Sequence, residues 1–319
     1  GMVAAFGLAK DSRLAALLII TAVQAVSIWN IGIKTGAAQN MVALGFIEEK
    51  FGKTITWSEW FLYAAPFSII MSIVLFFIMI NLIKPETEVI EGGKEVISKQ
   101  LAELGPLKGS EIRLIIISLT LLFLWATEGA LHPFDTTTVT IIAIALLLAP
   151  KIGVYSWSEV ERLIPWGTII VFSVGIALGS VLLNTQGAQW LSDTTFGTLG
   201  LDSMPLLATI AVVTLFNILI HLGFASATSL ASALIPVFIV LASTITADGD
   251  QQIGFILIQQ FVISFGFLLP ISAPQNMLAY GTGAFTTKDF LKSGIPLTII
   301  AYILVMIFSA TYWQWIGLL

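Results

Sequence analysis

The chain has 319 residues, of which 57% are hydrophobic and 10% are charged, with a formal net charge of −5. Soluble domains carry about 25% charged residues, so this composition excludes an ordinary water-soluble fold and indicates a polytopic membrane protein. The small negative charge, without a basic stripe, argues against nucleic-acid binding, and the absence of cysteine excludes disulfides and thiol chemistry.

Apolar segments follow one another along the chain and predict an all-α membrane fold. Several approach the roughly 20 residues that a spanning helix needs: residues 14–33, 61–83, 112–131, 167–183, 204–220, 253–272 and 295–316. Shorter ones cover residues 136–149 and 230–245. A long polar stretch, residues 84–110, separates the rest of a first repeat (residues 1–83) from a second repeat (residues 111–319).

A short phrase is repeated in the chain: residues 37–45 read AAQNMVALG and residues 273–281 read APQNMLAYG. The match continues downstream, where four residues of the first copy (Thr56, Glu59, Trp60, Pro66) correspond to four of the second (Thr286, Asp289, Phe290, Pro296). Paired interrupted segments at matching places are typical of secondary transporters with internal repeats. Because far more chain precedes the second copy, and Gly1 precedes Met2, we expect on the order of a hundred or more residues to be missing at the N-terminus.

The apolar run before each phrase contains residues that interrupt helices, among them Gly36 in the first run and Pro270 in the second. We predict broken helices over residues 14–50 and 253–285, which unwind near the middle of the membrane and restart at Asn40 and Asn276. Such breaks offer carbonyl groups to a cation and helix N-terminal amides to an anion. Candidate substrate ligands are Thr35, Gly36, Gln39, Asn40, Ser272, Pro274, Gln275 and Asn276. The alternative is that both are simple kinks whose amides join helices.

Lys34 is the basic residue that falls inside a predicted span, directly before Thr35. A lysine in hydrocarbon is costly and by default faces a cavity or a partner. Our hypothesis is that Lys34 offsets substrate carboxylate charge or replaces a bound cation. The alternative is that the span boundary lies elsewhere and the side chain reaches an interface.

The basic residues predict the orientation of the chain. Lys84, Lys94 and Lys99 lie in the polar loop 84–110, which we place on the cytoplasmic side of a plasma (inner) membrane by the positive-inside rule. Residues 156–165 (SWSEVERLIP) predict a short amphipathic helix along the interface. Glu128 and Asp135 flank one turn, and we expect both at the interface.

Residues 204–246 contain two apolar arms around a small, hydroxyl-rich centre and predict a re-entrant hairpin. Its tip would cradle a carboxylate with Ser226, Ala227, Thr228 and Ser229. The alternative is a small-residue packing face of the kind that Gly175 and Gly179 form. His221, on the first arm, is a candidate to bind substrate or carry a proton, or else it satisfies a buried carbonyl.

With these residues the chain resembles, over essentially its whole length, the divalent anion:sodium symporter family. PISAPQNMLAYGTG resembles the family's proline-containing break and half-helix, and IPWGTIIVFSVGIALGSVL its span before the second hairpin. FASATS stands where many members carry a Ser-Asn-Thr tip, with Ala227 in the middle place. The stretch from His221 to Ser226 is similar to the citrate and 2-oxoglutarate/malate translocator branch.

The resemblance implies an inverted-repeat transporter with alternating access, whose first hairpin would lie upstream of Gly1. Its substrates would be di- or tricarboxylates, moved by sodium-coupled symport or by carboxylate exchange. Candidate sodium ligands are Ser226, Thr228 and Ser272, with no other cofactor. The partners would be the carboxylate, the lipid bilayer and a second copy in a homodimer.

Two other classes were weighed. A cation/proton antiporter also uses broken helices, but it needs a buried acidic proton carrier, and no Asp or Glu lies mid-span in the sequence. An enzyme is not predicted, because no metal-ligand cluster or nucleophile–base pair occurs at helical spacing.

Overall fold

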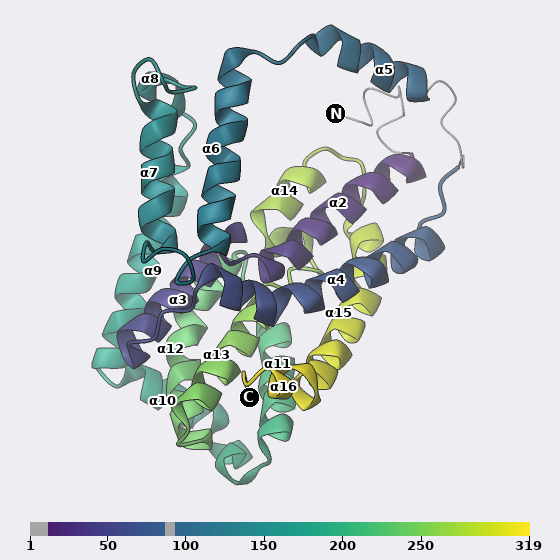
Figure 1. Cartoon of the computed structure of the whole chain (residues 1–319). Coiled ribbons are helices and arrows are strands. Elements are labelled where there is room, and N and C mark those ends of the chain that lie inside the picture. The colour runs from purple at the N-terminus through teal and green to yellow at the C-terminus, as the bar shows by residue number, and fades with distance from the viewer. Residues whose placement is uncertain (1–11, 87–92) are drawn as a thin grey trace. The chain divides into compact units, whose positions relative to one another are not determined.

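The computed structural model describes residues 12–86 and 93–319, and every regular element in these ranges is a helix (Figure 1). The first part contains α2 (Arg13–Gly32), η1 (Lys34–Gly36), α3 (Ala38–Phe51), α4 (Trp57–Leu82) and α5 (Gly93–Leu104). The middle contains α6 (Gly109–Ala126), α7 (Thr136–Leu148), α8 (Trp157–Val160), α9 (Trp166–Asn184), α10 (Gly187–Phe196), η2 (Gly197–Leu199) and η3 (Leu201–Ser203). The last part contains α11 (Leu206–His221), α12 (Ala227–Ile245), α13 (Gly249–Ile263), η4 (Pro270–Ser272), α14 (Pro274–Tyr280), α15 (Thr287–Ala310) and α16 (Tyr312–Trp315). The predicted all-α fold is confirmed.

Six helices of the described ranges are long and apolar enough to cross a membrane: α2, α4, α6, α9, α12 and Thr287–Trp315. The chain is therefore an integral, multi-pass membrane protein. The apolar run 253–272 does not form one helix, because α13 ends at Ile263 and turns follow it. Leu269 is extended and leads into the 3-10 turn η4, which begins at Pro270.

The structure adds a helix to one polar segment and shortens the predicted helix in another. The loop 84–110 contains helix α5, whose exposed Ile97, Leu101 and Leu104 recur at helical spacing, a pattern that its many charges obscured; residues 87–92 of this loop lie outside the described ranges. The amphipathic helix expected over residues 156–165 is the single turn α8, because the chain turns again before Pro165.

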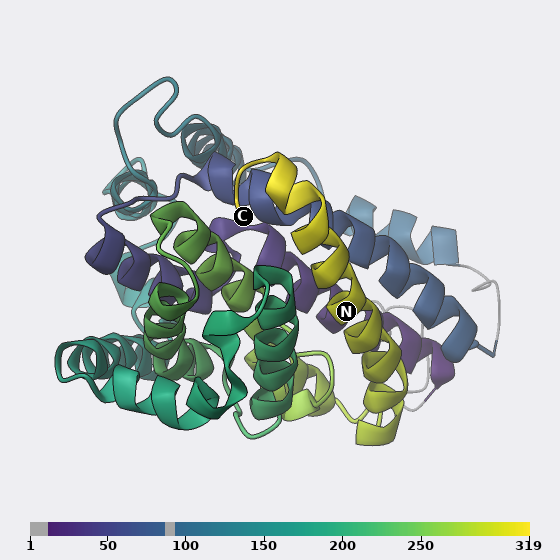
Figure 2. The ribbon, with the colours of Figure 1, turned by 90° about the horizontal axis from the view of Figure 1, so that it is seen from below.

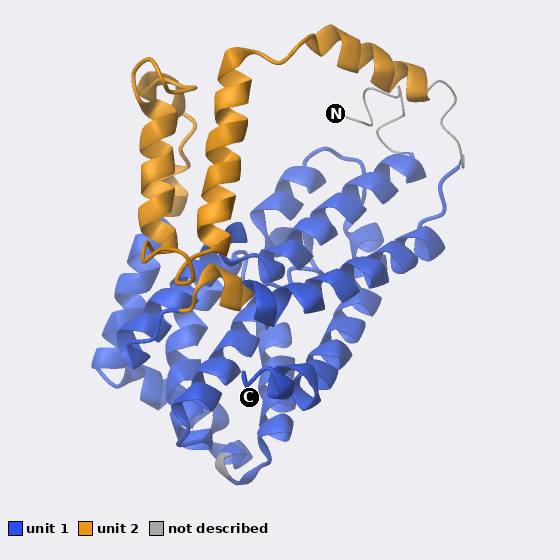
Figure 3. Cartoon of the chain, viewed as in Figure 1, with its two compact units in different colours: residues 1–54, 61–88, 170–319 blue, residues 55–60, 89–169 orange. Residues whose placement is uncertain are grey.

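The chain divides into two compact units (Figure 3). The larger comprises residues 1–54, 61–88 and 170–319, and the smaller comprises residues 55–60 and 89–169. Helices α4 and α9 each begin in the smaller unit and continue in the larger one. Both breaks and the predicted hairpin belong to the larger unit, so the candidate site is described within it.

The repeated residues downstream of each phrase start a helix in the same way. Thr56 and Glu59 exchange hydrogen bonds before α4, where the Thr56 amide donates to the Glu59 carboxylate (2.7 Å) and the Glu59 amide to the Thr56 hydroxyl (3.2 Å). Thr286 and Asp289 make the same pair before α15, at 2.9 and 3.2 Å. These are capping boxes, which is why the last span begins at Thr287 rather than near residue 295.

Small residues let helices of the larger unit pack closely. A Cβ on Gly175 would collide with the Ser232 side chain of α12, and one on Gly179 would collide with the ring of Phe46 on α3. Helix α12 packs in turn on α3 and α13, while α11 packs on α13 and α15. The Gly175-xxx-Gly179 pattern is therefore a packing face that fixes α9 against the helices of the candidate site.

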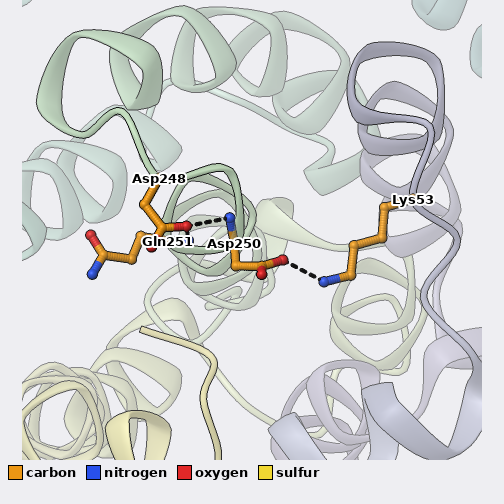
Figure 4. A network of polar contacts seen from close by, with 4 residues as sticks. All are labelled: Lys53, Asp248, Asp250 and Gln251. Carbon is orange, nitrogen blue, oxygen red and sulfur yellow. Dashed lines mark hydrogen bonds and ion pairs between the residues drawn. The ribbon is translucent and has the colours of Figure 1, made fainter.

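An ion pair joins Lys53, two residues after the end of α3, to Asp250 at the start of α13 (Figure 4). The Lys53 ammonium lies 2.6 Å from the Asp250 carboxylate, with the two side chains 43% and 71% exposed. Asp248 caps α13 by accepting from the amides of Asp250 (2.9 Å) and Gln251 (3.5 Å). Because the pair is exposed, we assign it at most about 1 kcal/mol, and the packing of α13 depends on its buried side chains instead.

The smaller unit is organised by Glu128, which is only 6% exposed. Its carboxylate accepts from the amide of Trp57 (2.8 Å), the amide of Thr136 (3.0 Å) and the Thr136 hydroxyl (2.7 Å). It thus caps the starts of α4 and α7 at once. Neighbouring Asp135 caps α7 from the outside, and hydrogen bonds from Thr138 lower the pKa of its carboxyl below the ordinary value. The interfacial prediction missed this structural role of Glu128, because Trp57 lies 71 residues before it and Thr136 follows only after a turn.

We predict that Glu128→Ala lowers the free energy of unfolding by about 2–4 kcal/mol, because two buried amides and a hydroxyl lose their acceptor. Glu128→Gln, which keeps one acceptor oxygen, should lose roughly half as much. Thermal unfolding in detergent is the measurement, with Glu103→Ala on exposed α5 as the matched control. Equal stability of Glu128→Ala and the control would contradict the capping role.

Candidate functional site

The two breaks have the same backbone form. Ile33 (φ −119°, ψ 120°) and Leu269 (φ −124°, ψ 140°) lead into the 3-10 turns η1 and η4. Ala37 (φ −149°, ψ 145°) and Ala273 (φ −150°, ψ 145°) lead out of them into α3 and α14. The repeated phrase therefore encodes a repeated conformation, in which the helices restart at Ala38 and Pro274, two residues before the expected Asn40 and Asn276.

An asparagine closes each break from inside. The side-chain Nδ2 of Asn40 donates to the carbonyls of Asn30 (2.7 Å) and Ile33 (3.1 Å), and that of Asn276 donates to the carbonyl of Gly266 (2.7 Å). In both copies the strong bond joins residues ten positions apart. The asparagines thus satisfy backbone carbonyls that the interruption of the helix leaves without amide partners.

The second asparagine keeps an unused acceptor. Asn40 Oδ1 accepts from Gln260 Nε2 at 3.1 Å, so both ends of its amide are occupied. Asn276 Oδ1 is buried and has no hydrogen-bond partner among the described residues. Within the described ranges, Gln24 Oε1 and Gln260 Oε1 are buried without a partner as well. Because such atoms are costly, a ligand could supply missing contacts at both breaks, and within the repeated phrase Asn276 Oδ1 is the atom that offers one.

Glutamines from each broken helix reach the break of the other. The phrase recurs after 236 residues, and the same offset carries Gln24 onto Gln260. Gln24 Nε2 donates to the carbonyl of Phe267 beside the second break (3.0 Å), as Gln260 Nε2 donates to Asn40 in the first. Both glutamines are fully buried. The two breaks are therefore held together by a reciprocal pair of amide contacts.

A second reciprocal pair comes from the phrases themselves. Gln39 Nε2 donates to the Ser264 hydroxyl at the end of α13 (3.2 Å), and Gln275 Nε2 donates to the Ser27 hydroxyl of α2 (3.1 Å). These contacts use the two predicted glutamine ligands to join the repeats. Gln39 and Gln275 therefore act here as amides that join helices, which was the alternative to a ligand role.

The predicted hairpin consists of α11 and α12 joined through residues 222–226. Ser226 caps α12 by accepting from the Ser229 amide at 3.3 Å, and Thr228 and Ser229 are half-buried in its first turn. No hydrogen bond among the described residues joins the hydroxyls of Ser226, Thr228 or Ser229 to either break. Ala227 is buried against the helix pack and brings only its backbone.

His221 ends α11 beside the second break. It is 3% exposed, and neither ring nitrogen has a hydrogen-bond partner in the described ranges. The backbone of Ser272, a buried residue of η4, lies near the imidazole. His221 therefore brings unsatisfied ring nitrogens to the second break, and its role as a ligand is a prediction.

The remaining predicted residues lie at the openings of the breaks. Gly36 and Pro274 are exposed and Thr35 is half-buried. Lys34 lies in η1 and is 4% exposed, and its carbonyl accepts weakly from Asn40 Nδ2 (3.4 Å). The snorkelling alternative would leave this side chain exposed, so its burial favours a role inside the protein.

Neither restarted helix has a side-chain cap. Ala37 precedes α3 and Ala273 precedes α14 without any side-chain hydrogen bond to their first amides. An uncapped N-terminus leaves amides and a partial positive charge for an anion. Helix α3 has 14 residues and α14 has 7, so the larger dipole lies at the first break.

Sequence reasoning missed Gln24, Gln260, Ser27 and Ser264, although a signal was present. Extending the 236-residue offset upstream of the phrase would have matched the two glutamines. It also missed Gly294 on α15, where a Cβ would collide with the Phe267 carbonyl, because a close approach of two backbones has no local sequence signature.

Comparison with known proteins gives one family and several relatives. The family described as "Sodium:sulfate symporter transmembrane region" matches residues 1–319. A "Membrane protein" of Cupriavidus necator is 47% identical over 317 residues, which cover 99% of this chain and 62% of that protein. The "Sodium-dependent dicarboxylate transporter SdcS" of Staphylococcus saprophyticus is 24% identical over 93% of this chain and 58% of its own length. A "Citrate/succinate antiporter" of Escherichia coli is 26% identical over 82% of this chain and 52% of its own length. The chain thus spans between half and two thirds of these relatives.

We predict that Gln24→Leu and Gln260→Leu each lower the free energy of unfolding by about 1–3 kcal/mol, because Phe267 and Asn40 lose a buried donor. Thermal unfolding of the single and double variants measures the effect, with Gln314→Leu on the exposed face of α16 as the control. If both buried variants match the control, the amide contacts do not hold the breaks together.

Proposed function

The chain belongs to the sodium:sulfate symporter transmembrane family, and from this membership we propose that it carries the substrate site of a secondary active carboxylate transporter. The family places the chain among transporters rather than enzymes. The observation that carries the proposal is the pair of matching breaks. In each break an asparagine side chain bonds a backbone carbonyl, and a glutamine from the other broken helix donates a further hydrogen bond.

The anion would bind between the uncapped starts of α3 and α14. Amides at Ala38 and Gln39 face no side-chain cap, and the hydroxyl of Thr35 is half-buried next to them. A dicarboxylate carries one charge at each end, so it fits two half-helix starts better than one. Lys34, buried beside Thr35, would offset part of the substrate charge.

The substrate class is inferred from two relatives. One is called a dicarboxylate transporter and the other a citrate/succinate antiporter. A short dicarboxylate of the succinate type satisfies both names, and we propose it as the substrate. Ser226, Thr228 and Ser229 at the hairpin tip would contact it when the site closes.

A sodium ion fits the second break. The groups at the second break are oxygens: the unpartnered Oδ1 of Asn276 and the hydroxyl of buried Ser272. In this proposal the hydroxyls of Ser226 and Thr228 would join them when the hairpin tip closes on the site. Hard cations take oxygen ligands, so the donor set suits sodium. A bound cation would neutralise substrate charge near its carboxylate.

The packing supports transport by alternating access. The two broken helices and α12 are tied by buried contacts, so they would move as one body past the helices that stay fixed. We further propose that loop 84–110 is cytoplasmic in the plasma (inner) membrane and that the protein forms a homodimer.

The rival class of cation/proton antiporters loses support. Such proteins need a buried acidic proton carrier at the site. Within the described ranges, the buried acidic side chain is Glu128, which lies in the smaller unit and is occupied by three hydrogen bonds.

We predict that the complete protein containing this chain, reconstituted in proteoliposomes, takes up radiolabelled succinate. Uptake driven by an inward sodium gradient identifies symport, and uptake that requires internal carboxylate identifies exchange. Protein-free vesicles are the control. Proton-coupled cation flux without carboxylate uptake would overturn the proposal.

A matched asparagine pair tests the site. Asn40→Ala and Asn276→Ala each remove the side-chain donor that satisfies backbone carbonyls within one break, so both should lower the free energy of unfolding by about 1–3 kcal/mol. Only Asn276→Ala also removes a free acceptor, and it should raise the KM for succinate or for sodium about tenfold more than Asn40→Ala. Equal KM changes in the two variants would exclude Asn276 Oδ1 as a ligand.

A further inference from the structure

An apolar groove lies between α4 and α15, away from both breaks. Its volume is about 510 Å³, and it is lined by Ile73, Val74 and Phe77 of α4 and by Pro296 and Ile300 of α15. Lys292 and Asn81 lie at one end of it. Ligand pockets in proteins cover about 300–1,000 Å³, so the groove is large enough for a bound molecule.

The groove exists because the two helices are tied at one end only. Pro66 has no N–H, so it leaves the Leu62 carbonyl of α4 without its helical donor. The Tyr312 hydroxyl donates to that carbonyl (2.8 Å), and the indole N–H of Trp313 donates to the Tyr63 carbonyl (2.8 Å). From this junction α4 and α15 diverge, as Figure 2 shows, and the groove fills the space between their far ends.

The open end of the groove is basic and its walls are apolar. Lys292 is exposed there, Lys288 lies one turn earlier on α15, and Lys84 follows the last groove residue of α4 by two positions. Asp289 is engaged by Thr286 in the capping box of α15, through two bonds of 2.6 and 2.9 Å to one carboxylate oxygen. These hydrogen bonds leave the Asp289 carboxylate charged, but the three lysines outnumber the nearby acids Asp289 and Glu86. The charge near the open end is therefore positive, next to a long apolar surface.

We propose that this groove binds an anionic phospholipid, with an acyl chain along Val74 and Ile300 and the headgroup phosphate at Lys292. Basic residues at the ends of clefts between membrane helices recognise anionic headgroups, and the apolar walls reward a hydrocarbon chain. A small carboxylate substrate would gain nothing from those walls. The site is separate from the proposed transport site and does not depend on the transported substrate.

The proposal is tested by lipid retention. The complete protein is purified from vesicles of phosphatidylcholine with phosphatidylglycerol, and the phospholipid that stays bound is measured by native mass spectrometry. Phosphatidylglycerol should be enriched over its share in the vesicle. Lys292→Gln should lower the enrichment about fivefold, as expected for one lysine near an anionic headgroup. Lys99→Gln on exposed α5 is the matched control and should leave it unchanged.

A second variant tests the apolar wall. Ile300→Trp, which fills the groove, should remove the enrichment while Lys292 is retained. These 319 residues contain no cysteine. In the complete protein, with any cysteine outside them replaced by serine, Val74→Cys provides a single thiol in the groove. Its labelling by a membrane-soluble maleimide should be slower in phosphatidylglycerol vesicles than in pure phosphatidylcholine.

Three outcomes would overturn the proposal. Equal retention of both lipids by the unaltered protein would remove the headgroup preference. Equal loss in Lys292→Gln and Lys99→Gln would make the charge effect non-specific. A Val74→Cys thiol that is protected in every lipid, with no phospholipid retained, would mean that protein covers the groove. Succinate uptake measured on the same samples stands or falls separately, so failure of this site leaves the transport proposal intact.

Discussion

The structure depends on one constraint: backbone groups that leave a helix inside a membrane must find partners within the protein. Two helices are interrupted here, and polar side chains satisfy the freed carbonyls. Asn40 and Asn276 act within their own breaks, and Gln24 acts across to Phe267. The hydrogen bonds that satisfy the freed carbonyls also hold the two breaks against each other. The same side chains therefore stabilise the interrupted helices and assemble the candidate site.

The sequence predicted the interruptions well, because glycine and proline act locally and the phrase occurs twice. It did not predict which hydrogen-bond partners the polar side chains find. Asn40 and Asn276 look equivalent in the phrase, yet only Asn276 retains a free acceptor, since Gln260 reaches Asn40 and no described residue plays that part for Asn276. Such differences depend on contacts between residues more than 200 positions apart, which no local pattern contains.

Other features stayed out of reach for a similar reason. Glu128 reads as a surface acid until Trp57 and Thr136 are brought to it from two helices. The Thr–Glu and Thr–Asp pairs after each phrase are a local signature of a helix start, and the sequence reading saw the repeat without recognising the caps. Contacts between distant parts of the chain, in contrast, have no local pattern from which they could be predicted.

The reciprocal glutamines have a consequence for inheritance. Gln24 donates to the backbone carbonyl of Phe267, which any residue supplies, whereas Gln260 donates to the side chain of Asn40. Recombination with a crossover between residues 51 and 249 would take Gln260 and Asn40 from different lineages. A chimera that keeps only one of these two residues would lose a buried contact between the breaks.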